Sequence, residues 1–243
     1  LGPAVKGAGR DVTPPVAPKN PKVRELHGDK FVDDYFWLRE KSNPDVTKYL
    51  ESENTYTDSI MKPLEGLQEQ LYKEMLGRIK ETDLSVPFRD GAYFYYSRTE
   101  QGKQYPIYCR KKGSLDAPEE IYLDVNELGK DKKFIGIGAL EVSDDGNLVA
   151  YSTDETGFRE YRLHVKDLRS GKVLADTVEK VVSVAWAKDN KTLFYTTPDA
   201  AKRSYRLYRH VVGAPAHDLQ YEEKDERFSV YVSRSRSRDY LWL

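Results

Sequence analysis

The chain has 243 residues, of which 39% are hydrophobic and 33% are charged, and its formal net charge is −1. A net charge near zero gives no support for binding to nucleic acid or to a membrane surface. The low hydrophobic content argues against one wide core, and the 18 tyrosines suit half-buried strands, so the composition favours β structure.

The single cysteine, Cys109, excludes an internal disulfide framework and favours a reducing compartment. We therefore expect a cytoplasmic location, with the periplasm as the alternative. No apolar run in the sequence approaches the length of a membrane span. The segment from Leu1 to Lys22 shows no hydrophobic stretch of a signal peptide, although a leader could have preceded Leu1.

The N-terminal part of the chain is predicted to be an extended strap followed by helices. Prolines at 14, 15, 18 and 21 deny residues 1–32 both helical and ladder hydrogen bonds. Residues 33–82 form the predicted helical segment, in which Asn43 or Ser42 caps a helix that starts at Pro44. Apolar residues follow a helical rhythm before and after Pro63, and we expect both stripes to pack against a neighbouring domain.

Residues 83–243 are predicted to be strands that belong to an internal repeat. Tyr151 and Tyr195 are 44 residues apart, as are Tyr161 and Tyr205 (195 − 151 and 205 − 161). Each repeat contains a strand, a turn at Asp-Gly or Asp-Asn, a second strand that ends in Tyr-Ser or Tyr-Thr, and a third strand at Tyr-Arg-Leu. Repeats of about 40–50 residues with several short strands are typical of propeller blades.

The predicted fold is therefore mainly β, a partial β-propeller behind an α-helical N-terminal segment. About three blades fit in the chain, and a further unit is predicted to start with a strand at Phe228–Ser233. A closed propeller needs about four to eight blades, so we expect the natural product to be longer.

No residue of the chain is predicted to be catalytic, cofactor-binding or metal-binding. The sequence has no Gly-x-Ser-x-Gly nucleophile elbow. Its four histidines, His27, His164, His210 and His217, have none of the spacings of a zinc site. We expect His164 and His210 on the blade surface, and Asp144-Asp145 in a repeat turn where Asp bonds the local backbone.

An alternating basic run near the end of the chain, Arg234, Arg236 and Arg238, allows two interpretations. In a strand the three side chains would share one face. A nucleic-acid patch is the first interpretation, and a solvated face or the wall of the propeller channel is the second. The second is favoured because the net charge is near zero and no aromatic residues are interleaved.

An ordered series of motifs resembles the prolyl oligopeptidase family of serine peptidases. The segment Asp34–Arg39, DYFWLR, followed by Asn43-Pro44, is similar to the opening motif of that family. The continuation resembles its oligopeptidase B branch at Glu74–Ile79, Ser85–Pro87, Tyr95–Arg98, Gly102–Ile107, Tyr122–Asn126, Glu141–Gly146, Ala150–Ser152 and Val165–Leu168. The resemblance covers residues 13–243, and the order of the motifs makes it specific.

The resemblance implies a propeller of about seven blades that caps a C-terminal α/β-hydrolase domain. In the family, the Ser, Asp and His of the triad lie in that domain, as do the acidic residues with which this branch selects Arg or Lys before the cleaved bond. None of those positions falls in this chain, so we expect it to be inactive alone. The strap and helices resemble the part that wraps the hydrolase domain, and the blades resemble a lid that admits only short peptides.

Three hypotheses follow. The first is the N-terminal gating portion of an oligopeptidase B-like serine peptidase, whose partners are its own C-terminal hydrolase domain and short peptide substrates, without a cofactor. The second is a non-catalytic propeller scaffold for protein–protein interaction. The third, and weakest, is a nucleic-acid binder that acts through the three arginines.

Overall fold

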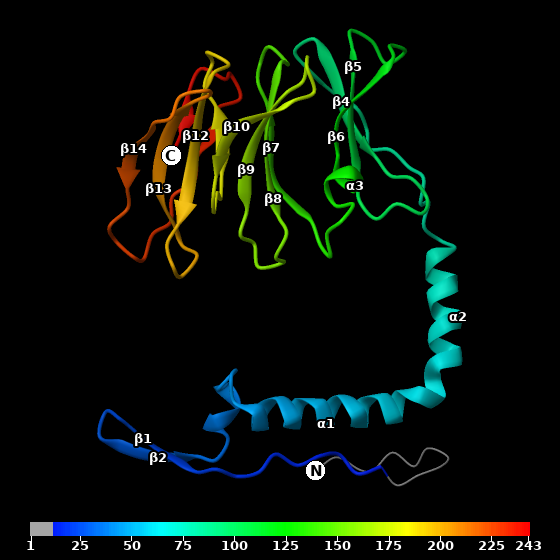
Figure 1. Ribbon diagram of the computed structural model, residues 1–243, viewed down its shortest axis with the longest axis vertical. Helices are drawn as coiled ribbons and strands as arrows, with labels where there is room; N and C mark the ends of the chain where they lie inside the picture. The colour runs from blue at the N-terminus through cyan, green and yellow to red at the C-terminus, as the bar shows by residue number, and fades with distance from the viewer. Residues whose placement is uncertain (1–11) are drawn as a thin grey trace. The chain divides into compact units, whose positions relative to one another are not determined.

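The computed structural model describes residues 12–243, so the first eleven residues of the predicted strap lie outside the described part. The chain divides into two compact units, of which the first ends at Ile79 and the second runs from Lys80 to Leu243. The first unit holds the long helices and the second holds most of the strands, as the colour sequence of Figure 1 shows.

The first unit contains a β-hairpin that the sequence analysis missed. Strands β1 (Lys22–Leu26) and β2 (Asp29–Asp33) pair antiparallel. The two residues between them, His27 and Gly28, have φ angles of 55° and 88°. Two consecutive left-handed residues form the tight turn that matches the twist of a hairpin. The strands were missed because almost all of their residues are exposed, which leaves no pattern of buried and exposed positions.

The helices of the first unit follow the sequence prediction. A short 3-10 turn (Phe36–Arg39) precedes helix α1 (Pro44–Met61), and a second 3-10 turn (Lys62–Leu64) leads into helix α2 (Glu65–Leu76). The side-chain oxygen of Asn43 accepts a hydrogen bond of 3.0 Å from the backbone N–H of Asp45, which confirms Asn43 as the N-cap.

The apolar stripe of α2 is exposed within its unit. Leu67, Leu71 and Met75 are 52%, 46% and 59% exposed. A stripe of this kind normally packs against another element. Its packing against a neighbouring domain stays a prediction.

In the described residues, the second unit forms three four-stranded antiparallel sheets whose strands follow one another in chain order. The first sheet contains β3 (Phe88–Asp90), β4 (Tyr93–Arg98), β5 (Ile107–Lys112) and β6 (Glu119–Asp124), followed by the short helix α3 (Val125–Leu128). The second contains β7 (Gly136–Val142), β8 (Leu148–Asp154), β9 (Arg162–Asp167) and β10 (Val173–Val178). The third contains β11 (Val184–Trp186), β12 (Thr192–Pro198), β13 (Ser204–Val211) and β14 (His217–Glu222).

The three sheets lie side by side in Figure 1, and each corresponds to one predicted repeat. The two tyrosines that are 44 residues apart occupy equivalent places, since Tyr151 pairs with His164 and Tyr195 pairs with Tyr208. The partial propeller is confirmed, and the sheets are called blades 1, 2 and 3 below.

The start of a fourth blade is shorter than predicted. It consists of β15 (Ser233–Arg234) paired with β16 (Leu241–Trp242), and the predicted strand over Phe228–Ser233 is wrong except at its last residue. The N–H groups of Val230 and Val232 donate instead to the Ser204 carbonyl oxygen and the Ser183 hydroxyl oxygen, at 2.9 Å each. A backbone N–H donates one hydrogen bond, so these two residues have no donor left for a strand partner.

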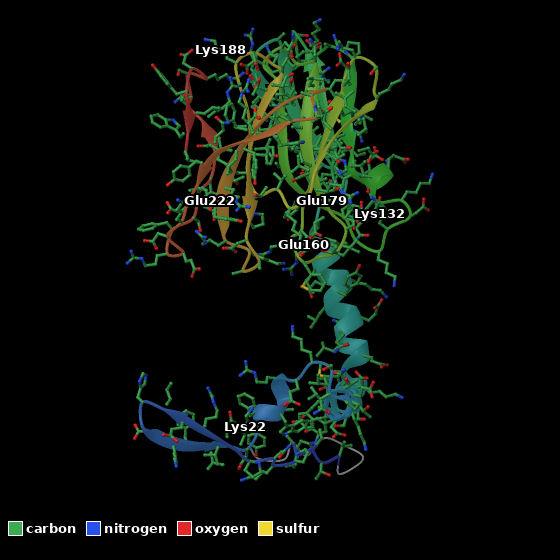
Figure 2. All side chains as sticks on the ribbon, turned by 60° about the vertical axis from the view of Figure 1, so that its left-hand side comes forward. Lys22, Lys132, Glu160, Glu179, Lys188 and Glu222 are labelled. Carbon is green, nitrogen blue, oxygen red and sulfur yellow. The ribbon has the colours of Figure 1, made fainter. Side chains whose placement is uncertain are left out.

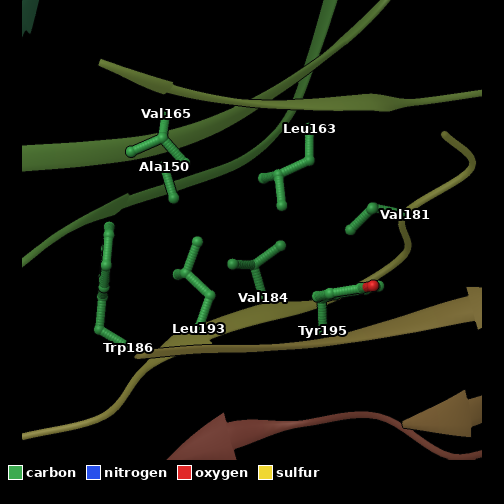
Figure 3. Packing of buried hydrophobic residues seen from close by; sticks show 8 residues of the cluster. All are labelled: Ala150, Leu163, Val165, Val181, Val184, Trp186, Leu193 and Tyr195. Carbon is green, nitrogen blue, oxygen red and sulfur yellow. The ribbon is translucent and has the colours of Figure 1, made fainter. Parts of the chain in front are cut away.

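The largest core cluster lies between blades 2 and 3, as Figure 3 shows. Its buried side chains come from both blades: Ala150, Leu163, Val165, Val181, Val184, Trp186, Leu193 and Tyr195. Trp186 is 1% exposed, and its indole N–H donates a 2.8 Å hydrogen bond to the carbonyl oxygen of Glu141 in blade 2. The cluster fixes the two blades against each other through apolar packing and one satisfied polar contact.

A second cluster joins blades 1 and 2. It contains Tyr95, Tyr122 and Leu123 of blade 1 together with Val149 and Tyr151 of blade 2. Because side chains alternate along a strand, β8 sends odd-numbered residues to this cluster and Ala150 to the other. The two clusters thereby hold blades 1, 2 and 3 next to one another. This fixes the positions of the turns between their strands.

Candidate functional site: the inner turns of the blades

The first strand of each blade forms one edge of its sheet, and these edges adjoin one another. Strand β7 contacts β11, and β11 contacts β15. We call this side of the second unit the inner edge, since the blades of a propeller surround a central channel. Figure 2 shows Lys188, in the turn after β11, at one end of the sheets and Glu160 at the opposite end.

The turn that follows the first strand is repeated in blades 2, 3 and 4. Each turn is closed by a backbone hydrogen bond, which is 2.9 Å from Ser143 to Leu148, 2.8 Å from Ala187 to Thr192 and 2.9 Å from Ser235 to Tyr240. The three turns therefore have the same length and correspond residue by residue in sequence.

The fourth residue of each turn adopts a left-handed backbone. Gly146, Asn190 and Arg238 have φ angles of 71°, 58° and 65°. Gly adopts this conformation freely and Asn tolerates it, whereas a residue such as Arg bears a cost of about 1–2 kcal/mol. Arg238 shares this backbone conformation with Arg159, Lys180 and Lys202, so its contacts, and not its φ angle, set it apart.

Arg238 takes part in a group of ion pairs that joins blades 1, 2 and 4. Its guanidinium binds the Asp144 carboxylate at 2.8 Å and also pairs with Asp90, at the end of β3. Arg234 binds both oxygens of Asp144, each at 2.8 Å. These four residues, Asp90, Asp144, Arg234 and Arg238, are called the inner-turn ion cluster.

The turn of blade 3 is tied to its neighbours at the same end. The Lys188 ammonium binds the Asp239 carboxylate of blade 4 at 2.6 Å. The side-chain oxygen of Asn190 accepts a 3.1 Å hydrogen bond from the backbone N–H of Asp145 in blade 2. All four blades in the described residues are thus connected at this end by polar contacts.

The electrostatics of the inner-turn ion cluster favour its charged form. Hydrogen bonds from Arg234, supported by the charge of Arg238, hold the pKa of the Asp144 carboxyl below its usual value. The hydrogen bond with Asp90 raises the pKa of Arg238.

The predicted arrangement of the three arginines is wrong, because only Arg234 lies in a strand. Arg234 and Arg238 point to the same carboxylate, whereas Arg236 is exposed and has no ion pair among residues 12–243. Asp144 lies in the predicted turn, but its role as the acceptor for two arginines was missed. The signal available in the sequence was the alignment of position 238 with Gly146 and Asn190.

The structure brings together two histidines that the sequence analysis kept apart. The rings of His210 and His217 stack with centroids 4.1 Å apart. His210 is 2% exposed, so its predicted surface position is wrong, while His164 is half-buried. The His210 ring lies 2.8 Å from the Asp176 carboxylate of blade 2 and 3.0 Å from the Ala216 carbonyl oxygen. The contact between His210 and Asp176 therefore links blades 2 and 3.

The first unit has its own cleft of about 480 Å³, between the strap and α1. Trp37 forms one wall, and its indole N–H donates a 3.0 Å hydrogen bond to the carbonyl oxygen of Pro18. Tyr49 of α1 meets the Trp37 ring edge-on at 6.4 Å. The tryptophan of the DYFWLR motif therefore anchors the strap to the first helix.

Over residues 12–243, no group of three or more His, Cys, Asp or Glu side chains is arranged to hold a metal ion. In the same range, no helix has the length and apolar character needed to cross a membrane.

The family model for the N-terminal β-propeller domain of prolyl oligopeptidase matches residues 14–243. The chain belongs to this family. Among curated prolyl oligopeptidase relatives, it is 37% identical over 239 residues to Protease 2 of Moraxella lacunata, covering 94% of this chain and 35% of that protein. It is 38% identical over 263 residues to dipeptidyl aminopeptidase BI of Pseudoxanthomonas mexicana, covering 99% of this chain and 36% of that protein.

Solved structures of the same family have the same fold. Oligopeptidase B from Leishmania major superimposes with a TM-score of 0.84 at 28% identity, over 95% of this chain and 36% of that chain. Oligopeptidase B from Trypanosoma brucei superimposes with a TM-score of 0.83 at 31% identity, over 94% of this chain and 35% of that chain. The chain thus spans about a third of the length of these prolyl oligopeptidase relatives, and the oligopeptidase B resemblance is confirmed.

Proposed function

We propose that this chain is the gating portion of a serine oligopeptidase that cleaves short peptides after Arg or Lys. The observation that carries the proposal is the row of three blades, held face to face by continuous apolar clusters, in a chain that matches only the N-terminal third of its relatives. A ring of such blades surrounds a narrow channel, and folded proteins are too wide to enter it.

In this proposal the two units have different roles. The strap (1–32) and the helical segment (33–82) hold a C-terminal hydrolase domain, for which the exposed stripe of α2 offers an apolar contact surface. Residues 83–243 supply the first blades of the lid. The catalytic triad lies outside these residues, so the chain contributes access control and no bond-breaking group.

The cleavage preference is tested with the full-length gene product that contains this chain. We expect it to hydrolyse a short blocked peptide with Arg or Lys before the scissile bond and to spare a folded protein of the same composition. A substrate with a free N-terminal dipeptide separates this activity from dipeptide removal, which is what the name of the Pseudoxanthomonas relative states. Release of dipeptides alone would contradict the proposal.

The 243-residue chain serves as the matched control in the same assay. We expect no turnover of the blocked peptide, because the triad is proposed to lie elsewhere. Turnover by the chain that an active-site serine reagent abolishes would overturn the gating role. A gene product that hydrolyses none of the peptides would instead favour the alternative, a non-catalytic scaffold.

A scaffold role has one observation in its favour. Large aromatic side chains are exposed on the loops of the blades, among them Phe158 at 71% and Tyr240 at 67%. Exposed aromatic residues are enriched where proteins bind one another. A partner that binds the chain in the absence of any peptide would support this alternative.

We also propose a cytoplasmic location, because the one cysteine of the chain, Cys109, has no second cysteine in this sequence with which to form a disulfide. Fractionation of cells that express the gene product tests it. Recovery in the periplasmic fraction would contradict it.

A further inference from the structure

We propose that the turn Ser235–Asp239 is an ionic crossbar that spans the inner edge of the blades and bars peptides from one mouth of the channel. This inference rests on the proposed function in one respect, since it takes the blades to be part of a closed ring. It adds the residues that close the mouth and the kind of force that holds them.

The crossbar follows from which blades the ion pairs connect. Arg238 lies in the first hairpin of blade 4, whereas its partner Asp90 ends the first strand of blade 1. The contact therefore joins two blades that are not neighbours in the chain order. Blades that are neighbours in the ring need no such reach, because they already contact each other through apolar clusters.

The crossbar is fixed at intermediate points. Asp144 of blade 2 binds Arg238 at 2.8 Å and holds Arg234 through both carboxylate oxygens. The Arg234 guanidinium also donates to the carbonyl oxygen of Arg238 at 3.3 Å, which orients the backbone of the turn. Lys188 of blade 3 binds Asp239 at 2.6 Å. A bidentate arginine pair is geometrically specific, so the turn is held in one position.

The turn itself does not require an arginine. Gly146 and Asn190 occupy the same left-handed position in blades 2 and 3, where they fit without strain. In blade 4 the strained backbone of Arg238 is offset by two ion pairs that reach other blades. Gly and Asn fit the turn, and the arginine in blade 4 adds the two ion pairs that reach blades 1 and 2.

A peptide that passes through this mouth would have to displace the ion pairs. Glu141 of β7 is a suitable reporter position, because it is accessible to solvent and lies three residues before Asp144 in the chain. Cys109 does not interfere with a thiol probe. It is fully buried, and burial raises the pKa of its thiol to about 11.

The test uses the full-length gene product with the reporter substitution Glu141→Cys and measures its rate of reaction with a bulky maleimide. We compare it with Glu141→Cys/Arg238→Gly, in which glycine relieves the left-handed backbone and should preserve folding. The matched control is Glu141→Cys/Arg236→Gly, which changes an exposed arginine of the same turn. Circular dichroism melting confirms that all three are folded.

We expect the Arg238→Gly variant to react about tenfold faster than the reporter alone, since two partly exposed ion pairs are lost. The Arg236→Gly control should react at the reporter rate. High salt should accelerate the reporter more than the Arg238→Gly variant, because the variant lacks both ion pairs of Arg238 and keeps those of Arg234 and Lys188.

Two results overturn the inference, and they are distinguishable from failure of the proposed function. Equal labelling rates of all three variants, in a product that contains a complete ring of blades, would contradict the crossbar. They would leave the proposed gating function untouched. A gene product that ends before the ring closes would overturn both. Labelling needs no peptidase activity, so a catalytically inactive product still gives a decisive result.

Discussion

His210 and Asp176 make a buried polar contact between strands β13 and β10 of neighbouring blades. Their side chains are 2% and 8% exposed. One ring nitrogen of His210 lies 2.8 Å from the Asp176 carboxylate, and the other lies 3.0 Å from the Ala216 carbonyl oxygen. Asp176 also accepts a 2.6 Å hydrogen bond from the backbone N–H of Gly213.

Replacing Asp176 by Asn should therefore lower the free energy of unfolding by about 1–3 kcal/mol, because a neutral amide replaces the carboxylate that contacts the buried His210 ring and accepts from Gly213 N–H. Asp218→Asn is the matched control, since its 3.4 Å contact with Arg209 lies between two largely exposed side chains. That control should cost less than about 1 kcal/mol. Equal losses in urea titrations of the two variants would contradict the importance of the buried pair.

His164 makes the second unit sensitive to mild acid. Burial lowers the pKa of this histidine below its usual value of 6.5, and its ring lies 3.1 Å from the Thr153 hydroxyl oxygen. The unfolded chain therefore takes up a proton near pH 6.5 that the folded chain resists, so the free energy of unfolding falls as the pH decreases through that value.

Urea titrations at pH 7.5, 6.5 and 5.5 measure this loss, in a range above the usual titration of carboxylates. His164→Gln should reduce the loss between pH 7.5 and 5.5. His27→Asn, in the exposed turn of the first unit, should leave it unchanged. An unaltered pH profile in His164→Gln would show that another group is responsible.

Among the elements, the strap depends on one side chain for its position. Trp37 is 6% exposed, and its indole N–H binds the Pro18 carbonyl oxygen at 3.0 Å. Trp37→Phe keeps an aromatic ring but removes the donor, which is worth about 1 kcal/mol, or about fivefold in the local opening equilibrium.

Limited trypsin digestion should accordingly cut after Lys19 about fivefold faster in Trp37→Phe than in the unmodified chain. Trp242→Phe is the control, because Trp242 is 62% exposed and lies in the other unit. If both variants are cut at the unmodified rate, the hydrogen bond does not hold the strap.

The elements also show where sequence reasoning succeeds. The blades were predictable because their interfaces repeat apolar and tyrosine positions every 44 residues, and such repetition survives changes in the individual side chains. The cap at Asn43 was predictable because capping is local. The irregular loop before β15 was not, since its backbone bonds distant side chains, such as the Ser183 hydroxyl that accepts from Val232 N–H 49 residues away.

The inner-turn ion cluster was beyond prediction for the same reason. Arg238 and Asp90 are 148 residues apart in sequence, and nothing local marks them as partners. The buried position of His210 was missed because its polar partner, Asp176, belongs to another blade. Contacts between distant turns follow from the curvature of the whole row of blades, which an isolated chain pattern does not encode.

At the scale of the molecule, the two units should respond separately to a lesion in one of them. Leu193 is fully buried between blades 2 and 3. Leu193→Ala should lower the stability of the second unit by about 2–5 kcal/mol. Leu219→Ala, on the outer strand β14 and 49% exposed, is the matched control with a small effect.

Hydrogen exchange followed by mass spectrometry shows where the loss is felt. Blades 2 and 3 should lose the most protection in Leu193→Ala, because repeats contact mainly their neighbours. Helices α1 and α2 belong to the other unit and should keep their protection. A uniform loss over both units would show that the chain unfolds as one cooperative body.

The two-sided burial of β8 has a consequence for how such a ring can change over time. Val149 and Tyr151 belong to the contact with blade 1, and Ala150 belongs to the contact with blade 3. Deleting a single residue from β8 would exchange the two sets and mismatch both neighbours at once. Length variation is therefore confined to the turns, and a blade transplanted from another ring must bring two compatible surfaces with it.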